Sequence, residues 1–205
     1  MNRTNYQAQL DLLIERNKET GITPSLFLHC CCAPCSSYVL EYLSEYFRIT
    51  VFYYNPNISP EGEYLKRKAE LNRLIAEMPF KNPVSVVDCD YDSAAFFDSV
   101  KGLEKCSEGG ERCFVCYDLR LRKTAEVARE MGFDYFASTL SISPLKNASK
   151  LNEIGRKLAN KYDVEWLPND FKKREGYKRS IELSRVYNLY RQNYCGCVFS
   201  KNRQE

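Results

Sequence analysis

Short apolar runs alternate with stretches of helical periodicity along most of the chain. Five buried strands are predicted from runs rich in apolar, β-branched and aromatic residues, at 26–31, 48–54, 84–87, 134–140 and 164–167. Between them, apolar positions recur every three or four residues and predict helices over 36–46, 61–78, 94–102, 113–131 and 148–161. Strands that alternate with helices are typical of the α/β class, with a parallel, doubly wound sheet and helices on both faces.

Two further helices are predicted at the ends of the chain. Tyr6, Leu10 and Ile14 form an apolar stripe before Gly21, so residues 1–25 are expected to add an amphipathic helix to the domain. The last long helix is predicted over 176–193, with an apolar face formed by residues 183, 186, 187, 190 and 194. No repeat, low-complexity tract or linker interrupts the pattern, so residues 1–205 are expected to form a single α/β domain.

Composition narrows the class of protein. The chain has 205 residues, of which 44% are hydrophobic and 28% charged, a mixture typical of globular proteins. Residues 1–25 carry charges throughout, which argues against a secretory signal or a membrane span and predicts a cytoplasmic protein with no membrane partner. Ten cysteines in a reducing compartment favour metal binding or redox chemistry over structural disulfides.

Positive charge concentrates near the carboxyl terminus. The net charge is +3, yet residues 171–205 contain nine Lys or Arg against three Glu. This asymmetry indicates a basic segment for a polyanionic partner, and a solvated helix face is the equally open alternative.

The first predicted strand leads into four cysteines, in the run Leu28-His29-Cys30-Cys31-Cys32-Ala33-Pro34-Cys35. Cys30 shares a strand face with Leu28 and is expected to be a core residue. Cys31, Cys32 and Cys35 lie at or beyond the strand end, where ligands bind in parallel sheets and where a helix amino terminus favours thiolates.

A second pair, Cys113 and Cys116, has the C-x-x-C spacing that places two sulfurs on one side of a helical turn. Together with Cys31 and Cys32 it could hold an iron–sulfur cluster or structural zinc, and by itself it could be a redox dithiol. Cys35 is a rival for either ligand position at the first strand.

The third pair is Cys195-Gly196-Cys197. A C-x-C disulfide closes a small, strained ring that is easily reduced, so the pair could store two electrons. The alternative is two more metal ligands. Cys89 and Cys106 have no partner at a telling spacing and are interpreted as structural. His29, the single histidine, is expected to be a buried hydrogen-bonding residue rather than a general base.

Two polar loops are predicted at the same edge of the sheet as the first cysteines. Residues 55–60 follow the second strand, and residues 141–147, which include Lys146, follow the fourth strand and precede a helix amino terminus. Such a position suits a phosphate or ribose, although either loop could be a simple connection.

Five motifs, in order along the chain, resemble the cobalamin-independent epoxyqueuosine reductases. They are the cysteine run at 28–35, the turn at 54–58, the segment from Cys113 to Arg120, the loop at 138–147 and the segment from Tyr190 to Cys197. The resemblance covers nearly everything from Leu26 to Ser200, and it implies a fold similar to the adenine-nucleotide alpha-hydrolase and PP-loop group.

This resemblance also implies an activity and a set of site residues. The protein would reduce epoxyqueuosine to queuosine at the wobble position of tRNA, using a low-potential reductant or an electron donor protein. Cys31, Cys32, Cys113 and Cys116 would hold a [4Fe-4S] cluster, and Cys195 with Cys197 would form a redox-active disulfide. The epoxide takes up two electrons whereas a cluster passes one at a time, so a dithiol could supply or buffer the second.

Two other classes of function remain alternatives to an epoxyqueuosine reductase. One is an ATP-dependent, thiolating tRNA-modifying enzyme on the same scaffold, which would need a glycine-rich pyrophosphate loop where this chain has residues 31–35. The other is a zinc-stapled RNA-binding module, which fits the basic segment and leaves Cys195 and Cys197 without a role.

Overall fold

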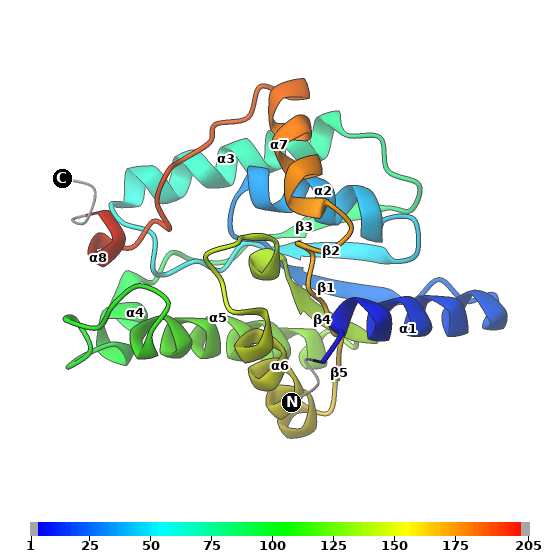
Figure 1. The fold of residues 1–205 in the computed structure, drawn as a ribbon, viewed down its shortest axis with the longest axis horizontal. Coiled ribbons are helices and arrows are strands. Elements are labelled where there is room, and N and C mark those ends of the chain that lie inside the picture. The colour runs from blue at the N-terminus through cyan, green and yellow to red at the C-terminus, as the bar shows by residue number, and fades with distance from the viewer. Residues whose placement is uncertain (1–3, 202–205) are drawn as a thin grey trace.

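A computed structural model describes residues 4–201 as one parallel sheet with helices on both faces (Figure 1). The strands are β1 (Ser25–His29), β2 (Arg48–Phe52), β3 (Val84–Val87), β4 (Tyr135–Ser138) and β5 (Glu165–Trp166). Their order across the sheet is β3-β2-β1-β4-β5, and every neighbouring pair is parallel. This doubly wound arrangement confirms the predicted fold class. Residues 1–3 of the amino-terminal extension and 202–205 of the basic segment lie outside the described range.

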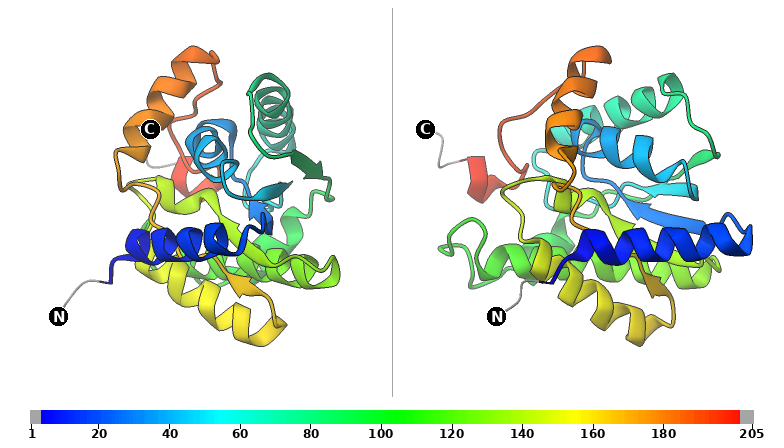
Figure 2. Two further views of the ribbon diagram at one scale, coloured as in Figure 1. Left: turned by 90° about the vertical axis from the view of Figure 1, so that its right-hand side faces the viewer. Right: turned by 45° about the vertical axis from the view of Figure 1, so that its right-hand side comes forward.

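The α-helices form two layers around the sheet (Figures 1 and 2). One layer contains α2 (Ala33–Leu43), α3 (Glu61–Glu77) and α7 (Gly176–Val186), and the other contains α5 (Glu111–Glu130) and α6 (Ala148–Tyr162). The remaining α-helices are α1 (Tyr6–Thr20), α4 (Ser93–Ser99) and α8 (Val198–Lys201). The amino-terminal helix is present as predicted, and it buries Leu10 and Ile14 in the core. None of the helices within residues 4–201 has the length and apolar composition needed to cross a membrane.

Strand alternation divides the core into two halves. Leu26 and Leu28 of β1 face the layer of α2 and α3, whereas Phe27 faces α5 and α6. Both faces of the central strands β1 and β4 are covered, which is why these strands are largely apolar rather than alternating with polar residues. Burial on both faces keeps the centre of the sheet rigid beneath the loops at its carboxyl edge.

The direction of winding reverses between β1 and β4, which are neighbours in the sheet although they are far apart in sequence. At such a switch point the loops that leave adjacent strands diverge and open a crevice at the carboxyl edge. The loop after β1 carries Cys31 and Cys32, and the short 3-10 helix η1 (Thr139–Ile142) follows β4. The topology therefore places the first cysteine run beside the crevice.

The predicted final helix is wrong beyond Val186. Asn188 adopts the left-handed conformation, with φ 47°, and its N–H bonds to the carbonyl of Arg185. The Leu189 N–H bonds back to the carbonyl of Ser184, which completes a Schellman cap. Val186, the last residue of α7, is 71% exposed rather than part of a buried face, and Leu189 is buried instead. Residues 187–197 form an extended tail rather than a helix (Figure 1).

Candidate active site

A cavity of about 420 Å³ opens at the carboxyl edge between β1 and β4. Four segments contribute to its wall: residues 31–35 after β1, 55–58 after β2, 140–146 after β4, and 191–195 of the tail. Both polar loops expected at this edge are therefore present there. The switch point and the cavity coincide, as expected for an open α/β sheet.

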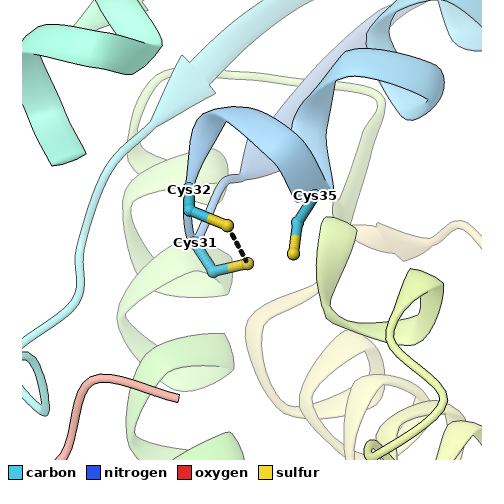
Figure 3. A group of neighbouring side chains, drawn as sticks. All are labelled: Cys31, Cys32 and Cys35. Carbon is cyan, nitrogen blue, oxygen red and sulfur yellow. Dashed lines mark hydrogen bonds between the residues drawn. The ribbon is translucent and has the colours of Figure 1, made fainter. Parts of the chain in front are cut away.

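Three thiols lie close together at the amino terminus of α2 (Figure 3). The Sγ atoms of Cys31, Cys32 and Cys35 all lie within 4.8 Å of one another, and those of Cys31 and Cys32 are 3.9 Å apart. Hydrogen bonds from Cys32 and Cys35 hold the pKa of Cys31 well below its ordinary value. The same contact with Cys31 raises the pKa of Cys32 to about 12 and raises that of Cys35 as well. The group thus favours one thiolate that accepts from two thiols.

The fourth cysteine of the run, Cys30, is fully buried in the core, as predicted. Burial raises the pKa of its thiol, which keeps it neutral. It is a structural residue.

Cys113 and Cys116 lie in the first turns of α5, as their spacing predicted. They line a second cavity of about 10 Å³, together with Cys195 and Cys197. Cys113 Sγ accepts a hydrogen bond from the Gly109 N–H at 3.2 Å, and burial raises the pKa of Cys116 to about 11. Within residues 4–201 these two sulfurs do not join the group formed by Cys31, Cys32 and Cys35.

The two cavities share a wall. Asn57, Arg120, Lys146 and Cys195 line both of them. Seven of the ten cysteines therefore line two adjoining cavities, four in each, because Cys195 belongs to both. The structure brings all six predicted site cysteines to one region of the molecule, and it adds Cys35.

The C-terminal pair is held by contacts from distant elements. All ten cysteines fall within residues 4–201, and no disulfide joins any two of them, so Cys195 and Cys197 are thiols in this structure. Lys146 Nζ donates to Cys195 Sγ at 3.2 Å, and the Ser59 N–H donates to the carbonyl of Gly196 at 2.9 Å. Gly196 has φ +110°, and a Cβ there would lie 2.9 Å from Arg67 Nη1, so the tail at this point requires glycine.

Several buried polar atoms around the cavities lack a partner among the described residues. They are Nη2 of Arg67 and of Arg120, Oδ1 of Asn55 and of Asn57, and the Tyr117 hydroxyl. A buried polar group without a hydrogen bond costs about 1–3 kcal/mol, so such a concentration indicates groups that a ligand would satisfy. The thiols are the ligands that iron–sulfur clusters and zinc take, so the donor set fits either group.

Sequence reasoning missed Arg67 and Arg120 as residues of the site. Arg120 is four residues after Cys116 and donates from Nε to its carbonyl at 3.1 Å, so helical spacing could have placed it on the cysteine face. Arg67 lies in a helix rich in charges, where nothing local separates it from its exposed neighbours. It is 2% exposed, and its Nε pairs with Glu63 at 2.7 Å.

His29 has the structural role predicted for it. Its Nε2 donates to the carbonyl of Tyr54 at 3.0 Å, and its Nδ1 accepts from the Ser138 hydroxyl at 2.9 Å. Burial, reinforced by the positive charge of Arg120, lowers the pKa of His29 to about 4. The imidazole is therefore neutral near pH 7, and it connects β1, β4 and the turn after β2.

The basic segment is less positive at its surface than its composition suggests. Arg174 pairs with Asp11, and Arg179 pairs with both Glu41 and Glu182. Lys172 pairs with Asp170 and also donates to the carbonyl of Ser141. Much of this positive charge is neutralised within the protein, so the charge count alone overstated the basic surface.

Comparison with known proteins identifies the relatives of this chain. The family model described as "Epoxyqueuosine reductase QueH" matches residues 26–203. The epoxyqueuosine reductase QueH of Streptococcus pyogenes serotype M1 is 43% identical over 204 residues, which cover 98% of this chain and 80% of that protein. The protein of the same name from Staphylococcus epidermidis is 42% identical over 206 residues, covering 98% of this chain and 87% of that one.

A solved structure is also similar. It is the U34-tRNA thiolase NcsA from Methanococcus maripaludis with its [4Fe-4S] cluster, with a TM-score of 0.51 and 14% identity. The match covers 95% of this chain and 68% of that one. At this level of identity the likeness concerns the fold alone, which agrees with the α/β class predicted from the sequence.

Proposed function

Because this chain belongs to the epoxyqueuosine reductase QueH family, we propose that it reduces epoxyqueuosine at the wobble position of tRNA to queuosine. The observation that carries the proposal is the convergence of thiols on two adjoining cavities at the switch point of the sheet. A core of this size needs no thiols for stability, and a redox enzyme needs them at a ligand-binding edge.

We assign a [4Fe-4S] cluster to Cys31, Cys32, Cys113 and Cys116. The support is that all four line the adjoining cavities and that the buried polar atoms nearby lack partners. When bound, such a cluster supplies single electrons at low potential. Cys35 lies close enough to Cys31 and Cys32 to exchange roles with either of them.

Cys195 and Cys197 are the proposed redox pair. Converting an epoxide to an alkene with loss of water consumes two electrons and two protons, which two thiols supply as they form one disulfide. The structure holds the reduced form of this pair. A low-potential reductant or an electron donor protein must then restore the thiols after each turnover.

The cavity also has groups suited to a nucleoside. The modified base has to leave the anticodon stack to reach the thiols, and aromatic rings provide a surface for it to stack on. Tyr177 and Tyr194 line the cavity, and the Arg191 guanidinium lies 5.8 Å from the Tyr177 ring centroid. These residues would hold the base and exclude water from the thiols below it.

The second candidate is a thiolating tRNA enzyme on the same scaffold, favoured by the likeness to the Methanococcus maripaludis protein. ATP-dependent enzymes of this fold need backbone N–H groups from a glycine-rich loop to hold pyrophosphate. Here Cys31, Cys32, Ala33, Pro34 and Cys35 fill the turn after β1, with no glycine. Proline also lacks a backbone N–H to donate to a phosphate. The reductase is therefore the better supported function.

The test is turnover by protein purified without oxygen. Under a low-potential reductant, it is expected to convert epoxyqueuosine in tRNA to queuosine, read by mass spectrometry of the digested nucleosides. Addition of ATP should not change the rate. A thiolated nucleoside formed only with ATP, or no queuosine from protein that carries its full iron content, would overturn the proposal.

A further inference from the structure

The two thiols of the C-terminal pair lie in different surroundings. Cys195 is partly exposed and contributes to the wall of both cavities. Cys197 is 8% exposed, belongs to the wall of the smaller cavity and packs with Phe96 and Val100. A substrate bound in the larger cavity would therefore meet the sulfur of Cys195.

Lys146 distinguishes Cys195 further. Its side chain is 7% exposed, and its Nζ donates to Cys195 Sγ at 3.2 Å. The nearest carboxylate oxygen, from Glu108, lies farther away at 3.7 Å. The Cys197 sulfur has a neutral partner instead, the Ser200 hydroxyl at 3.6 Å. A buried ammonium therefore contacts one sulfur of the pair, and a neutral hydroxyl contacts the other.

The backbone around Lys146 fixes its side chain beside Cys195. Its backbone N–H bonds to the carbonyl of Ser143 at 3.1 Å, and the next residue, Asn147, caps α6 through the Lys150 N–H. Burial alone would lower the pKa of Lys146, but the charges of Cys195 and Tyr117 and the hydrogen bond to Cys195 together outweigh it and raise that pKa above its ordinary value. The ammonium is thus retained inside the protein by the sulfur that it contacts.

We propose that Cys195 is the thiol of the pair that reacts, that Cys197 resolves it, and that Lys146 activates Cys195 by charge and hydrogen bonding. This inference deepens the proposed function and rests on it. Lys146 lies in a loop that sequence analysis considered for phosphate or ribose, and here it has a different ligand, a sulfur of the protein itself.

The step balances with the epoxide as oxidant. Cys195 and Cys197 together give up two electrons and two protons, and one S–S bond forms between them. In the substrate, both C–O bonds of the epoxide break, a carbon–carbon double bond forms, and the oxygen leaves as water with the two protons. The two electrons for the next cycle come from the low-potential reductant that the proposed function requires.

The experiment measures thiol reactivity in the absence of substrate. Anaerobic, iron-loaded protein is treated with limiting iodoacetamide, and the tryptic peptide from Gln192 to Lys201 is sequenced by mass spectrometry to read Cys195 and Cys197 separately. Cys195 is expected to react at least about tenfold faster than Cys197 at pH 7, because it is the more exposed sulfur and contacts an ammonium.

Variants isolate the role of Lys146. Lys146→Met should slow alkylation of Cys195 by about tenfold, and Lys146→Arg, which keeps the charge, should restore it to within about threefold. Lys161→Met is the matched control, since Lys161 is exposed at the far end of α6, and it should leave the rate unchanged. Iron content is measured for each variant, so a loss of the metal centre is recognised directly.

Two results would overturn the inference. One is faster alkylation of Cys197 than of Cys195 in the wild-type protein, a comparison that needs no variant. The other is a Cys195 rate in Lys146→Met within twofold of wild type. Neither depends on turnover. If the reactivities differ as expected but wild-type protein makes no queuosine, then the proposed function fails and the chemistry of the pair stands.

Discussion

The Arg67 guanidinium donates a hydrogen bond from Nη1 to the carbonyl oxygen of Cys195 at 3.2 Å, across 128 positions of sequence. The same side chain pairs with Glu63 and lies 5.1 Å from the Tyr194 ring centroid. One buried arginine of α3 thus fixes the tail beside both cavities. Because an arginine is fully charged at any pH of interest, this anchor does not depend on pH.

Replacing Arg67 should release the tail. Arg67→Leu removes the bond to Cys195 and leaves Glu63 with only the Tyr190 hydroxyl, at a cost of about 1–3 kcal/mol in the free energy of unfolding. Hydrogen exchange at the Ser59 N–H, which bonds to the carbonyl of Gly196, should accelerate and turnover should fall. Arg122→Leu, at an exposed arginine of α5, is the control.

A second variant reaches the same contact from the other side. Gly196→Ala leaves Arg67 in place and puts a Cβ 2.9 Å from its Nη1, at a backbone φ that alanine adopts at a cost. It should also accelerate exchange at Ser59. Exchange unchanged in both variants would show that other contacts hold the tail.

The cysteine variants separate cluster ligands from redox thiols. Cys31→Ser, Cys32→Ser, Cys113→Ser and Cys116→Ser should each lose most of the iron, sulfide and brown colour, whereas the wild type should carry about four irons per chain. Cys195→Ser and Cys197→Ser should keep the iron and lose turnover. Colour and iron are measured on protein purified without oxygen, with Cys89→Ser as the control.

Cys35→Ser decides between two ligand sets. Under the proposed set it retains its iron, because Cys35 supports Cys31 by hydrogen bonding alone. Loss of iron from Cys35→Ser together with retention in Cys113→Ser would instead assign the metal to Cys31, Cys32 and Cys35. One zinc per chain in a colourless wild type would exclude the cluster altogether.

The sequence predicted the fold well because the central strands β1 and β4 are buried on both faces and therefore largely apolar. It also predicted that Cys30 is a core residue, since strand alternation depends on local pattern alone. The final helix was predicted too long because the tyrosines after Val186 continue the apolar spacing. Asn188 was the available signal, as a residue that tolerates the left-handed conformation.

The site was harder to predict, because its key contacts join segments far apart in sequence. Nothing near Lys146 or Arg67 indicates that either side chain turns inward toward Cys195. The sequence around Cys195 does not indicate these two contacts either, because they depend on how the tail crosses the carboxyl edge of the sheet. Such contacts require the three-dimensional fold, whereas the cysteine spacings can be read locally.

Contact with tRNA should depend on Arg191 more than on Lys178. Arg191 is exposed, lines the larger cavity and donates to the Tyr177 hydroxyl, whereas Lys178 pairs with Glu175. Arg191→Ala should weaken tRNA binding by about three- to tenfold and reduce the slope of log affinity against log salt by about 1. Lys178→Ala is the matched control. Equal effects of the two variants would mean that the segment binds RNA diffusely.

Acid should weaken the attachment of the tail through Glu70. Its carboxylate accepts from Arg73 at 2.9 Å and from the Tyr190 N–H, and these bonds, that of Arg73 foremost, lower its pKa below the ordinary 4.5. A carboxyl whose pKa is lower in the folded state stabilises the protein above its unfolded pKa, and that stability is lost as pH falls through the folded value.

Glu70→Gln should therefore be less stable than wild type at pH 7, and the difference should shrink as the pH falls from about 5 toward 3. Urea unfolding of both proteins across this range measures it. Glu77→Gln removes the other carboxylate on Arg73 without touching Tyr190, and so controls for the arginine pair alone. A difference between wild type and Glu70→Gln that stays constant from pH 7 to 3 would contradict the assignment, because the contribution of an ionised Glu70 has to disappear once the carboxyl is protonated in both states.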